Sequence, residues 1–361
     1  MQVVKTNKFR LHPTDSQKKK IDATIDSCRY LYNQLLHTKK EKYSQEKINI
    51  SKYDLVTLAS KIVLNTEVFS QTKQDVAIRI YKAFSNFFRR VKNKEKPGFP
   101  RFKGKYYYSS FTFPQSGFKL LLEDHKINIS KIGKIKTKYH TQIHGVIKTC
   151  TIVRKNDRYF ACITSIEEKE IKQQKIEKIV GLDLGLKTFA TLSDESKIEN
   201  PRIYNKEVEK IQRKISKEKD SVRKQELRKR LNTKWFRVEN KRHNFIHQTS
   251  RKLVNKYDCL VVEDLNIKSL QQLGNTRINK SISNVSWNTF VNTLTYKAEN
   301  AGKKVIKVNP KNTTKMCSSC GLLVPKELHE RIHKCTCGLV LDRDLNASLN
   351  ILRLGKESLD E

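Results

Sequence analysis

Residues 179–192 read IVGLDLGLKTFATL and place one carboxylate, that of Asp183, inside a short apolar run. A run of this length predicts a buried strand, and Gly185 allows a tight turn into a returning strand over 188–192. An acid inside a buried strand costs free energy unless its charge is compensated. A turn or capping Asp is the simpler alternative at this position.

Two later apolar segments also carry an acid. Residues 259–265 (CLVVEDL) predict a second buried strand with Glu263, and residues 339–352 (LVLDRDLNASLNIL) predict an apolar-periodic helix that begins at Asp344. Three acids, each on a different apolar element, favour one assembled metal site over three isolated turns.

The neighbouring acids Asp264 and Asp342 are alternatives to Glu263 and Asp344. Side chains alternate between the two faces of a strand, so Glu263 and Asp264 cannot both point into one site. Asp342 remains an alternative as a ligand or a supporting group.

The chain of 361 residues has a formal net charge of +37, from 74 Lys and Arg against 37 Asp and Glu. This length favours two or three domains, and the basic excess predicts a polyanionic partner. Nucleic acid is favoured over an anionic membrane because no amphipathic segment carries Trp and Leu on one side. With no apolar run near about 18 residues and no signal-peptide pattern, a soluble intracellular protein is expected.

The first half of the chain changes character twice. Residues 2–13 predict a strand ended by Pro13, and Thr14 with Gln17 forms a capping box that starts a helical part reaching to residue 103. Residues 106–178 alternate polar with β-branched or aromatic side chains, which predicts a small antiparallel barrel or sandwich. Five aromatic residues there could stack bases or fill the barrel interior: Tyr106, Tyr107, Tyr108, Phe111 and Phe113.

Between Asp183 and Glu263, residues 205–256 predict a long helical pair with 18 Lys and Arg against 6 Asp and Glu. This one-signed excess suits phosphates, although a charged helix face is usually only solvated. A polar loop over 266–286 is a candidate lid, and residues 287–300 predict a helix before the strand KVIKVN.

Four of the eight cysteines cluster late in the chain. Cys317 and Cys320 are followed after 14 residues by Cys335 and Cys337. Two close thiolate pairs on two turns predict one structural, tetrahedral zinc ion. Because the Cys-x-Cys pair is tighter than usual, His329 and His333 are spare ligand candidates.

Several segments together resemble the TnpB/OrfB family of transposon-encoded RNA-guided DNA endonucleases, which are related to compact type V CRISPR effectors. They are GLDLGLKTFA, VVEDLNI and CGLVLDRDLNASLNI with the cysteine cluster, and, in the first half, KFRLHPTDSQKKKID, CRYLYN, AFSNFFRRVKNKEKPGFPRFK and SSFTF. The resemblance covers nearly the whole chain, and the order of the acids around the cysteine cluster is specific.

The resemblance implies a multidomain α+β protein. A wedge β-barrel (1–13 and 104–178) would enclose a helical recognition insert (14–103). A RuvC nuclease domain of RNase H-like α/β topology (179–310 and 338–361) would hold an inserted zinc ribbon (311–337). The tail after Asp344 is only 17 residues, so a long basic extension is absent from this sequence.

The resemblance also implies roles for residues. Asp183, Glu263 and Asp344 fall on the family's catalytic positions, where two Mg²⁺ ions would support phosphodiester hydrolysis. The expected partners are a guide RNA and double-stranded DNA bearing a short flanking motif, bound by a monomer in the prokaryotic cytoplasm near the nucleoid. Side chains at the helical insert and its junction with the barrel are expected to read that motif or hold the nucleic acid: Lys73, Gln74, Arg79, Lys96, Arg101 and Lys103.

Two other functions fit the same residues. A nuclease-inactive, RNA-guided DNA-binding repressor could use this scaffold, although all three acids are present. A strand-joining transposase of RNase H fold also uses an acid triad, and it would join transposon ends without a guide RNA.

Overall fold

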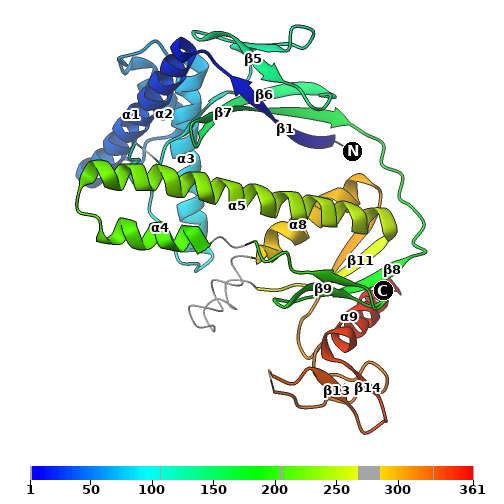
Figure 1. Cartoon of the computed structure of the whole chain (residues 1–361). Helices are drawn as coiled ribbons and strands as arrows, with labels where there is room; N and C mark the ends of the chain where they lie inside the picture. Colours follow the sequence, from blue (N-terminus) through cyan, green and yellow to red (C-terminus); the bar gives the residue numbers. More distant parts are fainter. Residues whose placement is uncertain (1, 106, 204–205, 267–284, 328, 361) are drawn as a thin grey trace. The chain divides into compact units, whose positions relative to one another are not determined.

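The computed structural model describes residues 2–105, 107–203, 206–266, 285–327 and 329–360 (Figure 1). The chain divides into two compact units, Met1–Glu170 and Ile171–Glu361, and each is described by itself below. The expected lid over 266–286 lies almost wholly outside the described residues.

The first unit contains one seven-stranded antiparallel sheet in the order β2-β6-β7-β1-β5-β4-β3. Its strands are β1 (Gln2–His12), β2 (Ser110–Phe113), β3 (Phe118–Leu121), β4 (Lys126–Ile129), β5 (Gly133–Lys138), β6 (Val146–Lys155) and β7 (Arg158–Glu168). The edge strands β2 and β3 are joined by residues 114–117 alone, so the sheet must curl until its edges approach. The ring centroids of Phe113 and Phe118 on these two edges lie 6.4 Å apart.

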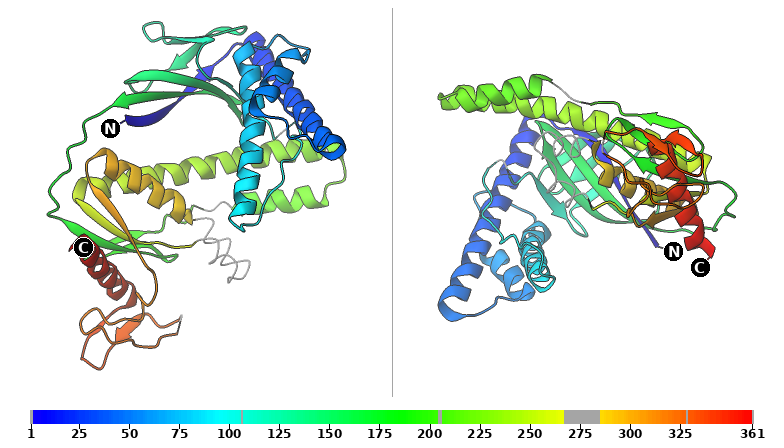
Figure 2. Two further views of the ribbon diagram at one scale, coloured as in Figure 1. Left: turned by 180° about the vertical axis from the view of Figure 1, so that it is seen from behind. Right: turned by 90° about the horizontal axis from the view of Figure 1, so that it is seen from below.

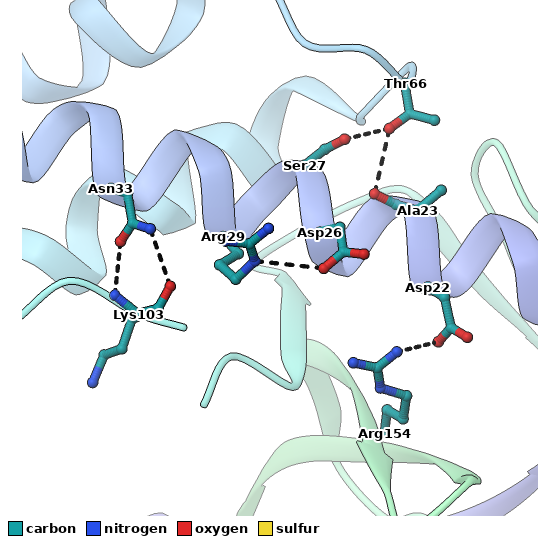
Figure 3. Close-up of polar contacts among 9 residues, drawn as sticks. All are labelled: Asp22, Ala23, Asp26, Ser27, Arg29, Asn33, Thr66, Lys103 and Arg154. Atoms are coloured by element: carbon teal, nitrogen blue, oxygen red, sulfur yellow. Dashed lines mark hydrogen bonds and ion pairs between the residues drawn. The ribbon is translucent and has the colours of Figure 1, made fainter. Parts of the chain in front are cut away.

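Three helices cover this sheet: α1 (Asp15–Glu46), α2 (Lys52–Lys61) and α3 (Ser70–Lys92). The predicted capping box is confirmed, because Thr14 and Gln17 bond reciprocally at the start of α1. One face of α1 is buried in the core that helices and sheet share, and its members are Ile21, Ile25, Cys28, Tyr32 and Leu35. Polar contacts also join α1 to β6, where Arg154 donates to Asp22 at 2.9 Å (Figure 3).

Three of the aromatic residues before and within β2 fill the interior of this unit, which was one of the two predicted roles. Tyr108, Phe111 and Phe113 are buried in the core. Tyr107 is 83% exposed, and Tyr106 lies outside the described residues. Core packing therefore accounts for three of these rings.

The second unit is built on a five-stranded mixed sheet in the order β10-β9-β8-β11-β12. Its strands are β8 (Ile179–Leu184), β9 (Thr188–Leu192), β10 (Lys197–Glu199), β11 (Cys259–Glu263) and β12 (Lys304–Val308). Strands β8, β11 and β12 are parallel neighbours, whereas β9 and β10 add antiparallel. A separate two-stranded sheet joins β13 (Ile332–Lys334) and β14 (Val340–Asp342).

Helices cover both faces of this sheet. They are α5 (Ser221–Lys256), α8 (Trp287–Asn300) and α9 (Arg343–Asp360), whereas α4 (Lys206–Lys217) packs on α5. Val180 and Leu182 of β8 pack with residues of α5 and α8 in one core cluster. Val261 of β11 packs on the other face with Ile351 of α9. Figures 1 and 2 show α9 on the opposite side of β8 and β11 from α8.

Two glycines allow α9 to approach the sheet closely. A Cβ at Gly181 of β8 would lie 2.2 Å from the carbonyl oxygen of Ser348, and one at Gly355 of α9 would lie 2.3 Å from a methyl of Val261. Real Cβ atoms do not make such contacts, so any side chain at Gly181 must push the helix backbone away.

Among the described helices, none combines the length and apolar character needed to cross a membrane.

We therefore predict that Gly181→Ala lowers the free energy of unfolding by about 2–4 kcal/mol, because a helix backbone cannot yield as a side chain can. Urea unfolding followed by circular dichroism measures this change. Gly98→Ala is the control, since the nearest atom to its Cβ would be 3.8 Å away at the end of the Arg90 side chain. Equal stability of both variants would contradict the close packing.

Candidate metal centres

Asp183 and Glu263 lie at the carboxyl ends of two neighbouring parallel strands, as the penultimate residue of β8 and the last residue of β11. The ladder between β8 and β11 pairs Val262 with Leu182, so the next residue of each strand is one of these acids. Side chains alternate along a strand, and both acids share the parity of Gly181 and Val261, which face α9. The strand geometry therefore directs both carboxylates to the face that α9 covers.

Asp344 lies in the first turn of α9. The chain thus brings together three acids from positions 183, 263 and 344. Burial and the negative charges of Glu263 and Asp344 raise the pKa of Asp183 to about 8. Arg343 opposes this effect, and its Nε lies 3.4 Å from an oxygen of Asp344.

The three carboxylates fit a site for hard divalent cations. Burial also raises the pKa of Glu263, although the hydrogen bond from Thr313 acts in the opposite direction. Oxygen donors of this kind are preferred by Mg²⁺, which tolerates retained waters beside a few carboxylates. The residues present therefore suit the two-ion site that the family resemblance implies.

Asp342 is placed differently from the three acids. Its Oδ1 accepts the backbone N–H of Asp344 at 2.9 Å and of Leu345 at 3.2 Å, while Oδ2 accepts from the ammonium of Lys197 at 3.1 Å. These bonds lower the pKa of Asp342 against the effect of its burial. Asp342 therefore caps α9 and helps to fix the position of Asp344. Asp264 is exposed and has the opposite parity from Glu263.

Three further residues hold this region and were missed by the sequence analysis. The hydroxyl of Thr313 donates to Glu263. The buried amide of Asn350 donates to the carbonyls of Thr313 (2.9 Å) and Met316 (2.7 Å), and Asn346 bonds the backbone of Met316 and Ser318. The sequence contained a signal for Asn346 and Asn350, because two asparagines four positions apart on the apolar face of a helix require buried hydrogen-bond partners.

The same asparagines secure the first turn of the cysteine cluster. The Sγ atoms of Cys317, Cys320, Cys335 and Cys337 all lie within 4.8 Å of one another, and this cluster could hold a metal such as zinc. In the part of the chain that the structure describes, no other group of three His, Cys, Asp or Glu ligands converges in this way.

The tight Cys-x-Cys pair therefore does not prevent all four thiols from meeting. His329 is exposed and lies outside the cluster. His333 is buried and its Nδ1 contacts the ammonium of Lys326, while the backbone N–H groups of Cys320 and Ser319 bond the thiolate of Cys317. These bonds outweigh burial and lower the pKa of Cys317 to about 7.

The six candidate nucleic-acid-binding residues differ in whether their side chains already contact other parts of the protein. Arg79 ties α3 to β2, because its guanidinium donates to Asp75, to the carbonyl of Ser110 and to the hydroxyl of Thr112. The ammonium of Lys73 donates to the carbonyl of Ile62, and the ammonium of Lys103 lies 6.0 Å from the ring centre of Tyr32. The three others are exposed: Gln74, Lys96 and Arg101.

Three family models match the chain in sequence order. A helix-turn-helix domain of OrfB proteins matches residues 1–47, which in the structure form β1 and the single helix α1. The OrfB model described as a probable transposase matches residues 162–273, and the Cas12f1-like TNB domain matches residues 287–351. Two of these three are OrfB models, so the chain is similar to the TnpB/OrfB family over residues 1–47 and 162–273.

Similar proteins span nearly the full length of this chain. A putative RNA-guided DNA endonuclease of Streptomyces pristinaespiralis is 26% identical and covers 98% of this chain and 90% of the relative. The putative RNA-guided DNA endonuclease InsQ of Escherichia coli (strain K12) is also 26% identical, over 96% of this chain and 91% of the relative. A cryo-EM structure of a Cas12f1–sgRNA–target DNA complex contains a chain of similar fold, with a TM-score of 0.58, 14% identity and coverage of 97% and 98%.

The cysteine cluster should hold about one zinc ion per chain, because four thiolates complete a tetrahedral site. Cys317→Ser should lower the zinc content to near zero and lower the melting temperature, since the binding energy of a structural metal is folding energy. Elemental analysis and thermal unfolding measure both effects. Cys162→Ser on β7 is the control and should retain zinc, whereas active protein free of zinc would contradict the assignment.

Asp183→Asn should stabilise the metal-free protein at about pH 8. The folded pKa of about 8 exceeds the ordinary value of about 4, so the stability contributed by the neutral acid is lost as the pH rises through 8. Asn cannot ionise, and its advantage should grow from about pH 5 to about pH 8, to roughly 5 °C in melting temperature.

Thermal unfolding with a chelator at both pH values measures this difference, and added Mg²⁺ should reduce it. Asp264→Asn is the control, because its carboxylate is exposed on the other face. The same melting temperature for Asp183→Asn and the parent protein at about pH 8 would exclude the buried, mutually repelling acids.

Proposed function

We propose that this protein is a transposon-encoded RNA-guided DNA endonuclease that hydrolyses phosphodiester bonds in one site. The observation that carries the proposal is the placement of Asp183, Glu263 and Asp344 on one face of the second unit, where burial and the charges of the other two acids raise the pKa of Asp183. The names of full-length relatives from two bacteria support the same activity.

The second unit supplies an RNase H-like scaffold of the RuvC type in this proposal. The strand order β10-β9-β8-β11-β12, with three antiparallel strands followed by two parallel additions, agrees with that topology. Residues 179–310 and 338–361 would form the nuclease domain around a zinc ribbon at 311–337. In the first unit, residues 1–13 and 104–178 would form the wedge barrel and residues 14–103 the recognition helices.

Asp183, Glu263 and Asp344 would hold Mg²⁺ in this site. Two such ions, when bound, supply an activated water and stabilise the leaving oxygen. The chain itself orients the carboxylates: Thr313 fixes Glu263, and the cap formed by Asp342 fixes the first turn of α9. The high pKa of Asp183 keeps this acid largely protonated near neutral pH until a cation displaces its proton.

The partners in this proposal are a guide RNA transcribed from the element and a double-stranded DNA target. The net charge of +37 suits both polyanions. The protein would act as a monomer in a ribonucleoprotein, in the cytoplasm of a prokaryote and associated with the nucleoid. Both full-length relatives named above come from bacteria.

Single substitutions of the three acids test the nuclease. Asp183→Ala, Glu263→Ala and Asp344→Ala should each lower Mg²⁺-dependent cleavage by at least about 10²-fold, because each removes a metal ligand, while guided target binding stays nearly unchanged. Cleavage and gel-shift assays with the guide RNA measure the two properties. Asp264→Ala should cut normally.

Other outcomes of these assays identify the alternatives. Normal cleavage by Asp344→Ala with loss in Asp342→Ala would move the third ligand to Asp342. Guided binding without any metal-dependent cleavage by the parent protein would indicate a repressor. Joined transposon ends in the absence of guide RNA would indicate a strand-joining transposase, and sequencing of RNA that co-purifies with the protein separates this case independently.

Reading of the flanking motif is proposed for the start of α3. Gln74 is exposed there, and its amide can donate to and accept from base edges in a groove. Gln74→Ala should change which flanking sequences are cut, by about 1–3 kcal/mol per lost contact, whereas Lys96→Ala should weaken all targets alike. Cleavage of a library with randomised flanks measures this, and unchanged preference and affinity in both variants would remove these residues from the target-reading surface.

A further inference from the structure

Four phenylalanines form an exposed group where α3 ends and the chain continues toward β2. The side chains of Phe88, Phe99 and Phe102 are 53%, 48% and 53% exposed, and Phe87 is partly buried beside them. We call these four residues the aromatic patch. Exposed apolar groups of this kind mark sites of interaction on soluble proteins.

The patch is rigidly attached to the core of the first unit. Phe99 packs edge-on against Phe84, which is buried, with ring centroids 5.6 Å apart, and against Phe87 at 5.1 Å. The ammonium of Lys40 on α1 lies 5.1 Å from the ring centre of Phe99 and 4.8 Å from that of Phe102. Each of these two rings is therefore fixed by neighbours while about half of its surface stays open.

The backbone beside the patch is also fixed. Asn33 of α1 accepts the N–H of Lys103 at 2.8 Å and donates to its carbonyl at 3.0 Å (Figure 3). Pro100, which lies between Phe99 and Phe102 in the sequence, is buried. Because this segment is tied down on both sides of Phe102, it presents the ring without the entropy cost of ordering a loose loop.

The surroundings of the patch are strongly basic. Residues 89–105 contain a single acid, Glu95, which accepts from Arg89 at 3.2 Å. The basic residues of this segment are Arg89, Arg90, Lys92, Lys94, Lys96, Arg101, Lys103 and Lys105. A second copy of this chain would bring the same positive charge and be repelled, whereas a nucleic acid offers aromatic bases together with negative phosphates.

We propose that the aromatic patch stacks unpaired bases of single-stranded DNA, while the surrounding Lys and Arg side chains contact its phosphates. This inference rests on the proposed function, because pairing of a guide RNA with one strand leaves the other DNA strand without partners. Bases of that strand lose their stacking, and a ring such as Phe102 restores it without regard to sequence.

The test uses the full-length chain without Mg²⁺ or guide RNA and a short single-stranded DNA that contains 2-aminopurine. Phe102→Leu and Phe99→Leu keep an apolar side chain but remove the ring. Each should weaken binding by about 5- to 100-fold and reduce the quenching of 2-aminopurine on binding, with the salt dependence unchanged. Arg101→Gln should instead lower the slope of log K against log salt by about 0.7 and keep the quenching.

Tyr53→Leu is the matched control. Tyr53 is also an exposed aromatic residue with a lysine over its ring, since Lys52 lies 5.8 Å from the ring centre, but it belongs to no group of rings. It should bind and quench as the parent protein does. Thermal unfolding checks that every variant is folded. Phe102 is more exposed than Phe99, so Phe102→Leu provides the test if Phe99→Leu is destabilised.

Several results would overturn the proposal: unchanged affinity and quenching in both Phe variants, an equal loss in Tyr53→Leu, or tighter binding of RNA than of DNA of the same sequence. Loss of self-association or of binding to anionic lipid vesicles in the Phe variants, with DNA binding intact, would assign the patch to those partners. Because these measurements involve no cleavage, they stand apart from the nuclease assays, and either set can fail alone.

Discussion

The direct contact between the backbone of α9 and strand β8 at Gly181 is the constraint on which the second unit depends. It places the first turn of α9 beside the ends of β8 and β11, where Asp183 and Glu263 leave the sheet. A side chain at this position would separate the helix from the sheet and carry Asp344 away with it. The geometry of the acids is thus set by a residue that has no chemistry of its own.

The same helix connects the two candidate metal centres. Near its start, Asn346 and Asn350 bond the backbone that leads into Cys317, and Thr313 on that segment bonds Glu263. Buried amides of this kind tolerate little displacement, because an unpaired partner costs about 1–3 kcal/mol. A structural ion among the four thiols would therefore stiffen the segment that supports the acids. The acids themselves oppose folding while no cation is present, since burial and mutual repulsion raise the pKa of Asp183.

Most helices and long strands of this fold could be predicted because their apolar periodicity is strong. The expected start of α1 at its capping box and of α8 at Trp287 agree with the structure. Strand β3, with the sequence FKLL, was missed because it is short and does not alternate. The roles of Arg79, Asn346 and Asn350 could not be read from the sequence, because each depends on a partner 28 to 37 positions away. Positions of the acids were visible as charges in apolar runs, whereas their mutual spacing depends on the packing at Gly181.

The place of β1 in its sheet has a consequence for how the protein is made. This first strand lies between β7 and β5, and its long partner β7 ends at residue 168. At ribosomal rates of about 5–20 residues per second, β1 waits roughly 10–30 s for that partner to emerge. The helices α1, α2 and α3 form in the meantime from local contacts, which are faster than distant strand pairings. During translation β1 therefore stays without its long partner until β7 has been synthesised, and the first unit cannot be completed before then.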